Sequence, residues 1–186
     1  MEIHQHPEGV AAEKRLPEDV EKREAGLTYD SVKSLRIPRK RFAVVRKYKS
    51  DLEAAGKVRI EIDDEITLYG NSIDVFTASS VINAIGRGFD YEEASLLFGD
   101  YLLYVIPISK DRKTLIRIRA RLIGRGGRVR KRIEEKTKSR ISIYGKTVSI
   151  IGKDEDLEMA REAVERLIEG KTHAVVFKFL EAKNKG

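Results

Sequence analysis

The sequence predicts an α+β protein in which one folding unit, a three-stranded sheet packed by helices, occurs twice in tandem. The first observation is an internal repeat, because the hairpin pattern of residues 59–62 and 66–70 recurs at 140–143 and 148–152. The second is that an amphipathic helix is expected after each hairpin. The third is the length of 186 residues, which provides room for two small domains.

The boundaries of these domains follow from changes in composition. Residues 1–34 contain two of the four prolines, alternate in charge and have few large apolar side chains, so we expect a flexible N-terminal extension. Apolar density rises from Leu35 onward. We therefore expect a first domain over 35–100, a second domain over 101–170, and a C-terminal tail over 171–186 that forms a docking helix.

Each repeat is expected to contain a hairpin followed by a helix. Apolar residues alternate along the strands, and tight turns are expected at 63–64 and 144–145. Gly86 and Gly170 occupy the positions where a C-terminal cap is needed. The apolar residues at helical spacing are Val75, Ala78, Ile82 and Ile85 in the first helix, and Leu157, Ala160, Val164, Leu167 and Ile168 in the second.

The segment before the second hairpin is less regular. Residues 101–108 are a strand candidate. Residues 115–123 fit an alternating strand and one face of a helix equally well, so periodicity leaves both assignments open. The glycine-rich run 124–127 then interrupts the chain, and Val129 with Ile133 begins an amphipathic helix.

Positive charge is concentrated in this same region. The chain has 37 Lys+Arg and 30 Asp+Glu, a net charge of +7, but residues 110–140 alone hold 14 basic and three acidic residues. Such a field attracts a polyanion, because each neutralised phosphate releases counterions. The alternative is a solvated helix face laced with salt bridges.

Catalysis and cofactors have little support in the sequence. The absence of cysteine excludes disulfides, thiol nucleophiles and Cys-ligated metal sites. Two of the three histidines, His4 and His6, lie in the N-terminal extension, and His173 is isolated and is expected to be a structural cap or a ligand contact. No nucleotide-binding P-loop or dinucleotide motif is present. We expect no enzymatic activity, no catalytic residue, no metal and no cofactor.

No apolar run approaches the roughly 20 residues needed to span a bilayer. The N-terminal residues lack the basic start and apolar centre of a secretory signal. We expect a cytoplasmic protein without a membrane partner.

The glycine-rich run resembles the signature of KH domains. An apolar pair, Leu122 and Ile123, precedes Gly124-Arg125-Gly126-Gly127, and a helix with Val129 and Ile133 follows. The resemblance implies the type I order of strand, helix, loop, helix, strand, strand, helix, and therefore a helix over 113–122. It also implies that the loop holds about four nucleotides of single-stranded RNA. Both domains are expected to be type I KH-like.

The chain from Leu35 onward resembles a two-KH family of ribosome assembly known as Pno/Dim. The resemblance is carried by the segments 36–38, 84–89, 123–128, 142–148, 170–173 and 179–181. It implies a monomer that binds single-stranded small-subunit rRNA near its 3′ end. It also implies a Nob-type endonuclease and the α-subunit of initiation factor two as partners, with a protein scaffold or translation-linked adaptor as the alternative function.

The two domains are expected to differ in their use. The first has residues 45–50 where a glycine loop would fall, so we expect it to be degenerate and to orient the second. Arg87 is open to an RNA contact or a helix-ending turn, and Phe177 and Phe179 are expected to be core or docking residues. The expected RNA-binding residues are Arg119, Arg121, Ile123, Gly124, Arg125, Gly126, Gly127, Arg128, Lys131, Arg132 and Ile143.

Overall fold

The computed structural model describes residues 30–183, and the first of its two units follows the order strand, helix, helix, strand, strand, helix. Two short helices then lead to the second unit. The elements are β1 (Ser31–Leu35), η1 (Arg39–Arg41), α1 (Phe42–Lys47), α2 (Lys49–Gly56), β2 (Arg59–Ile62), β3 (Ile66–Gly70), α3 (Ser72–Gly86), α4 (Tyr91–Ser95) and η2 (Leu96–Phe98).

The second unit repeats this order and adds one helix at its end. Its elements are β4 (Leu102–Pro107), α5 (Arg112–Ile123), η3 (Arg125–Gly127), α6 (Arg128–Thr137), β5 (Arg140–Tyr144), β6 (Thr147–Gly152), α7 (Asp154–Ile168) and α8 (His173–Lys183). The helix expected over 113–122 is thereby confirmed as α5. The Asp111 side chain caps this helix by accepting a hydrogen bond from the Thr114 N–H at 2.7 Å.

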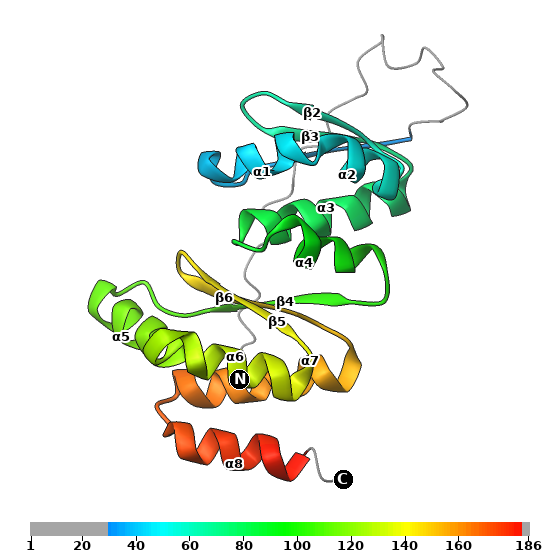
Figure 1. Cartoon of the computed structure of the whole chain (residues 1–186). Helices are drawn as coiled ribbons and strands as arrows, with labels where there is room; N and C mark the ends of the chain where they lie inside the picture. The colour runs from blue at the N-terminus through cyan, green and yellow to red at the C-terminus, as the bar shows by residue number, and fades with distance from the viewer. Residues whose placement is uncertain (1–29, 184–186) are drawn as a thin grey trace, which may run out of the picture.

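The two sheets have the same antiparallel topology, with orders β1-β3-β2 and β4-β6-β5. Sheets and helices alternate along the molecule, so the helices of the first unit lie between the two sheets (Figure 1). Strand β6 is buried on both faces as a result, because Ile150 belongs to the core of the second unit while Ile151 packs into the core of the first. The two units are thus packed directly on each other.

The folded structure begins earlier than the sequence predicted, at strand β1. Residues 31–34 were expected to belong to the extension, but they pair with β3 from Ser31 opposite Gly70 to Leu35 opposite Ile66. The error arose because this edge strand has polar side chains that find partners only in the fold. Ser34 lies 3.2 Å from Thr67, and the Lys33 ammonium donates to Ser79 at 3.0 Å. Residues 1–29 of the expected N-terminal extension lie outside the described residues.

Both hairpin turns differ slightly from the prediction. In the first, Ile62 pairs with Ile66, so the loop comprises three residues, 63–65, rather than the expected 63–64. In the second, Tyr144 pairs with Thr147, so the turn is 145–146 instead of 144–145. Gly145 has φ of +56°, and the first residue of a two-residue β-hairpin turn commonly has a positive φ.

The glycines after α3 serve packing between elements. Gly86 is still helical, and a Cβ there would lie 2.6 Å from the Ile37 side chain, so close approach and not capping explains it. Gly88 has φ of +101° and lies against the second sheet, where a Cβ would be 2.7 Å from the Ser142 hydroxyl. That hydroxyl donates to the Arg87 carbonyl oxygen at 2.8 Å, so this turn joins the two units.

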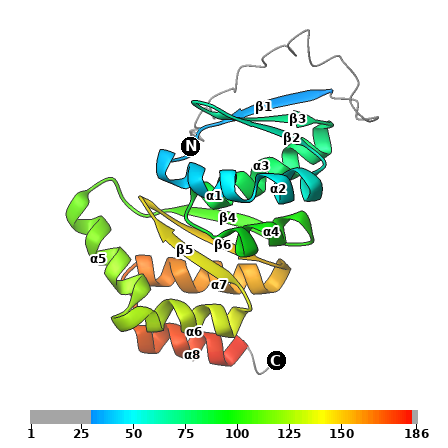
Figure 2. The same cartoon turned by 45° about the horizontal axis from the view of Figure 1, so that its top comes forward.

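Helix α8 packs on α6 and α7 and buries Val176 and Leu180 in the second core (Figure 2). Phe177 and Phe179 are half-buried against the same core, as expected for core or docking residues. Among the residues that the structure describes, no helix combines the length and hydropathy required to cross a bilayer.

Candidate nucleic-acid interface

The loop between α5 and α6 has a backbone that favours glycine. Gly124, Gly126 and Gly127 have φ values of +70°, +61° and +75°, which residues other than glycine rarely adopt. A Cβ on Gly124 would also lie 2.9 Å from the Cβ of Val129, so this glycine lets α6 turn back tightly against the loop. The loop thus folds as one 3-10 turn that passes directly into α6.

The outer part of this loop is open. A Cβ on Gly126 or Gly127 would meet no atom within 4 Å. Gly127 is also the N-cap of α6, where no side chain accepts a hydrogen bond from the first turn. An open backbone at the positive end of a helix dipole is suited to a phosphate group.

The cations nearest the loop are not neutralised by acids. Within residues 30–183, Arg125, Arg128 and Lys131 are exposed and form no ion pair. Arg128 only donates to the Arg125 carbonyl oxygen at 3.4 Å. These guanidinium and ammonium groups remain available to an anionic ligand.

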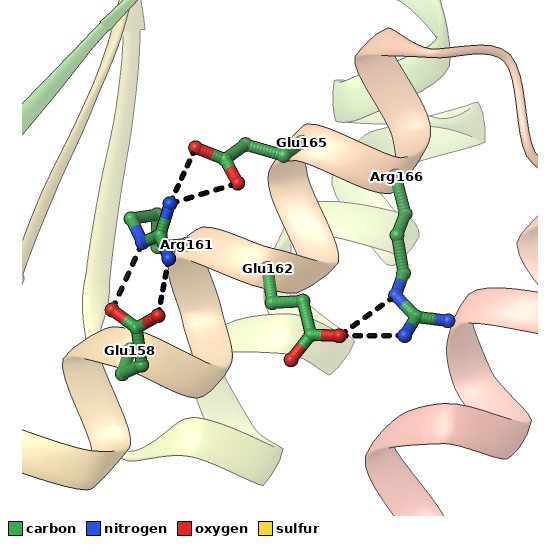
Figure 3. A network of polar contacts seen from close by, with 5 residues as sticks. All are labelled: Glu158, Arg161, Glu162, Glu165 and Arg166. Carbon is green, nitrogen blue, oxygen red and sulfur yellow. Dashed lines mark hydrogen bonds and ion pairs between the residues drawn. The ribbon is translucent and has the colours of Figure 1, made fainter.

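Helix α7 shows what a neutralised helix face looks like in the same protein (Figure 3). Arg161 bridges Glu158 and Glu165, and Arg166 donates to Glu162 at 2.6 Å. The hydrogen bond between Arg161 and Glu158 lowers the pKa of the carboxyl and raises the pKa of the guanidinium. The salt-bridged alternative therefore describes α7 and not the loop.

Two other predicted cations have partners inside the fold. Arg121 donates to the carbonyl oxygens of Gly170 and Lys171 at 2.8 and 2.9 Å, which ties α5 to the end of α7. Arg132 pairs with Glu181 at 2.6 Å. Arg119 is half-buried on α5, and the structure brings it no charged partner among the described residues.

The two apolar residues predicted for the site lie on neighbouring elements, α5 and β5. Ile123 ends α5 and Ile143 lies on β5, and both are half-buried. Ile116, earlier on α5, is 59% exposed and was not predicted from the sequence. Its seven-residue spacing from Ile123 places both on one helix face and was the signal available.

Glu134 connects α6 to the neighbouring strand. Its carboxylate accepts a hydrogen bond from the Ile141 N–H at 2.8 Å and pairs with Arg130 at 3.6 Å. Burial raises the pKa of Glu134. Burial likewise raises the pKa of Glu93, which lies on α4 of the first unit and interacts electrostatically with Glu134. Glu134 thus has a structural role, while Glu135 is exposed.

His173 begins α8, and its Nε2 lies 3.0 Å from the Arg121 carbonyl oxygen. Together with the hydrogen bonds of Arg121, this contact fixes the start of α8 near the end of α5. Arg87 donates to the Thr147 hydroxyl at 3.4 Å, so its place is at the junction of the units. No group of three His, Cys, Asp or Glu side chains among residues 30–183 is arranged to hold a metal ion.

Two units of this order, one with an open glycine loop between its paired helices, define a protein of the KH class, whose modules bind single-stranded nucleic acid. A family profile for the second KH domain of PNO1, described as a eukaryotic-type or type I KH domain, matches residues 103–185.

Similarity to individual proteins extends over both units. The KH domain-containing protein MJ0443 of Methanocaldococcus jannaschii is 37% identical over 81% of this chain and 73% of its own length. The pre-rRNA-processing protein PNO1 of Chaetomium thermophilum is 34% identical over 48% of this chain and 37% of its own.

A solved structure agrees with these relatives. The Dim2p chain in the crystal structure of an a/eIF2alpha-aDim2p-rRNA complex from Pyrococcus horikoshii is 34% identical, with a TM-score of 0.78 over 83% of this chain and 94% of that one. The chain belongs to the PNO1/Dim2 family of KH-domain proteins.

Proposed function

We propose that this protein binds single-stranded small-subunit rRNA, near its 3′ end, through the glycine loop of the second unit, and assists rRNA maturation by binding. The observation that carries the proposal is the open backbone at Gly126 and Gly127 beside the unpaired cations Arg125 and Arg128. The names of the relatives support the RNA class, since one is a pre-rRNA-processing protein and another was solved with rRNA.

The proposed contacts use the loop backbone and its cations for phosphates. Gly124, Gly126 and Gly127 allow close approach, Arg125, Arg128 and Lys131 neutralise charge, and the apolar side chains of Ile123 and Ile143 face the bases. Arg119 lies on the same helix as Ile123. Arg121 and Arg132 contribute less, because both are held by partners within the protein.

The experiment compares two double variants of the full chain. Arg125→Asp with Gly126→Asp should weaken binding to a labelled single-stranded rRNA 3′-end oligonucleotide about 100-fold, because two acids replace a cation and an open backbone. Arg46→Asp with Lys47→Asp, at the matching turn of the first unit, is the control and should change affinity far less. Fluorescence anisotropy at fixed salt measures both. Equal losses in the two variants would remove the loop from the proposal.

A second role as an adaptor is supported by the archaeal complex, which contains the α-subunit of initiation factor two. We extend the proposal to this partner, and to a Nob-type endonuclease on the family resemblance alone. The protein would act as a monomer in the cytoplasm. Calorimetric titration of the factor into the Arg125→Asp, Gly126→Asp variant should show unchanged affinity if the adaptor surface is separate from the loop.

A further inference from the structure

Helix α6 has two faces with different uses. It lies between β5 and α8 (Figure 2). On the β5 side, Arg130 donates to the Ile141 carbonyl oxygen at 3.3 Å and Glu134 accepts from the Ile141 N–H, so these side chains hold the sheet. On the α8 side, α6, α8 and the glycine loop line a cavity of about 830 Å³.

The charge around this cavity is strongly positive. Its cations come from the loop and from the outer face of α6, and Glu135 is the one acid among the lining residues. Three of the cations, Arg125, Arg128 and Lys131, have no ion pair within the described residues. The positive potential of these uncompensated cations favours an anionic occupant.

The cavity also has a flat, partly aromatic wall. The rings of His173 and Phe177 lie 6.2 Å apart at 24°, and the Arg132 guanidinium covers the Phe177 ring at 4.2 Å. The ion pair with Glu181 holds Arg132 in this position, and the Arg121 carbonyl oxygen holds His173. Aromatic rings and guanidinium planes are the surfaces on which unpaired bases stack.

The cavity is continuous with the glycine loop, because Arg125 of the loop and Arg128, the first residue of α6, both line it. We propose that it binds one or two nucleotides that flank those held by the loop, with Arg128 and Lys131 on phosphate and a base against the wall formed by His173, Arg132 and Phe177. This inference rests on the proposed function. It assigns to α8, which lies outside the repeated unit, a share in RNA binding.

Nucleotides fit this site better than an acidic peptide does. A peptide of aspartates and glutamates would satisfy the cations but would gain nothing specific from a stacked aromatic wall. A nucleotide uses both, since it carries its phosphate and its base at fixed separation. Dependence on the Phe177 ring therefore discriminates between these two occupants.

The test uses oligonucleotides of two lengths, because the loop alone is expected to hold about four nucleotides. The full chain is titrated with labelled single-stranded four-mers and eight-mers of the same sequence. Phe177→Leu should weaken binding of the eight-mer about five-fold or more and leave the four-mer unchanged, because the ring no longer supports the Arg132 guanidinium plane on which the base stacks. Lys131→Gln should weaken both oligonucleotides, but the eight-mer more than the four-mer, because Lys131 neutralises phosphate beside the loop and also lines the cavity.

Helix α8 provides matched controls. Phe179 is also half-buried, and the Arg166 guanidinium covers it at 4.2 Å, but it does not line the cavity. Phe179→Leu should leave both affinities unchanged, as should Lys178→Gln on the exposed side of α8. Thermal unfolding of each variant, followed by circular dichroism, shows whether weaker binding reflects a smaller amount of folded protein.

The outcomes separate the two proposals. If the wild-type chain binds neither oligonucleotide, the proposed function fails and this inference fails with it. If it binds four-mer and eight-mer equally, or if Phe177→Leu and Phe179→Leu behave alike, only the inference fails. A weakening with Lys131→Gln but none with Phe177→Leu would indicate an anion site without base stacking and overturn the nucleotide assignment. Cross-linking of a 4-thiouridine eight-mer to the peptide containing His173 and Phe177 would support it.

Discussion

The turn between α1 and α2 and the turn between α5 and α6 occupy the same place in their units but present different surfaces. In the first unit, the Tyr48 ring stacks on Tyr91 at 4.3 Å, and the Lys47 ammonium lies 4.8 Å from the Tyr48 ring centre. In the second unit, three of the four residues of the turn are glycines, and a Cβ on Gly126 or Gly127 would meet no atom within 4 Å.

This difference teaches how one fold serves two purposes. The residues of the first turn contact their own unit, since Tyr91 lies on α4 and the Tyr48 hydroxyl donates to Glu92 at 3.4 Å. The residues of the second turn contact little besides their own loop. A turn whose aromatic side chain packs on the same unit stabilises that unit, while a glycine-rich turn leaves its backbone accessible to a ligand.

The largest expected effect is a loss of stability when the backbone of the second turn is strained. Gly124→Ala should lower the free energy of unfolding by about 3 kcal/mol, because a backbone with φ of +70° and ψ of 174° is essentially confined to glycine, at a cost of about 1–3 kcal/mol for other residues, and contact with Val129 adds more. Gly126→Ala, with a similar φ but open space, is the control and should cost about 1 kcal/mol. Urea unfolding measures both. Equal costs would mean that Val129 yields to the added methyl group.

The next effect concerns the salt dependence of RNA binding. Arg125→Gln with Arg128→Gln should reduce the slope of log affinity against log salt by about 0.7 for each phosphate that is no longer neutralised. Arg46→Gln with Lys47→Gln should leave the slope unchanged if the first turn does not contact RNA. Anisotropy titrations at several salt concentrations supply the slopes. A reduced slope in the second pair would show that both turns contact the strand.

A smaller effect is expected from the aromatic pair of the first turn. Tyr48→Leu should lower the free energy of unfolding by about 1 kcal/mol, because leucine cannot stack on the Tyr91 ring. RNA affinity should remain within about two-fold of the wild type. A variant of unchanged stability but weaker RNA binding would instead make the first turn part of the interface.

The smallest effect is expected where the two units meet. Burial raises the pKa of Glu93 on α4 and of Glu134 on α6 above the ordinary value of 4.5, with Asp90 opposing and Arg140 favouring ionisation of Glu93. The native state therefore favours the protonated forms, and this contribution to stability is lost as pH rises from 4.5 through the raised values.

Glu134→Gln removes one of these titrations. The unfolding free energy of the wild type minus that of the variant should therefore decrease as pH rises above 4.5, the ordinary glutamate pKa. Urea unfolding between about pH 4 and pH 8 measures this difference. Glu135→Gln, at the exposed neighbouring position, is the control and should give a flat difference. A flat difference for Glu134→Gln would contradict the burial argument.

Local patterns predicted much of the fold. The alternating strands and the helices α3 and α7 follow from periodicity, and the resemblance resolved the ambiguous segment now seen as α5. Strand β1 was missed because its polar residues Lys33 and Ser34 have partners only across the sheet. A first unit that orients the second was expected, but the residues of the contact were not predicted, because ordinary residues such as Ser142 and Gly88 come together over long sequence distances.

The candidate site shows the same limit. The glycine loop and its cations are consecutive in sequence and therefore visible there. The hydrogen bonds that Arg121 donates to the end of α7 could not be predicted, since their acceptors lie about fifty positions away in the sequence. The wall of His173 and Phe177 beside α6 likewise arises only when α8 folds back.

The double burial of β6 has a practical consequence for anyone who dissects this protein. A fragment starting at residue 101 would leave Ile151 and the half-buried Leu103 without the cover that the first unit provides. The second unit is therefore not an independent folding unit. Moving it into another protein would require new apolar side chains to cover this face of its sheet.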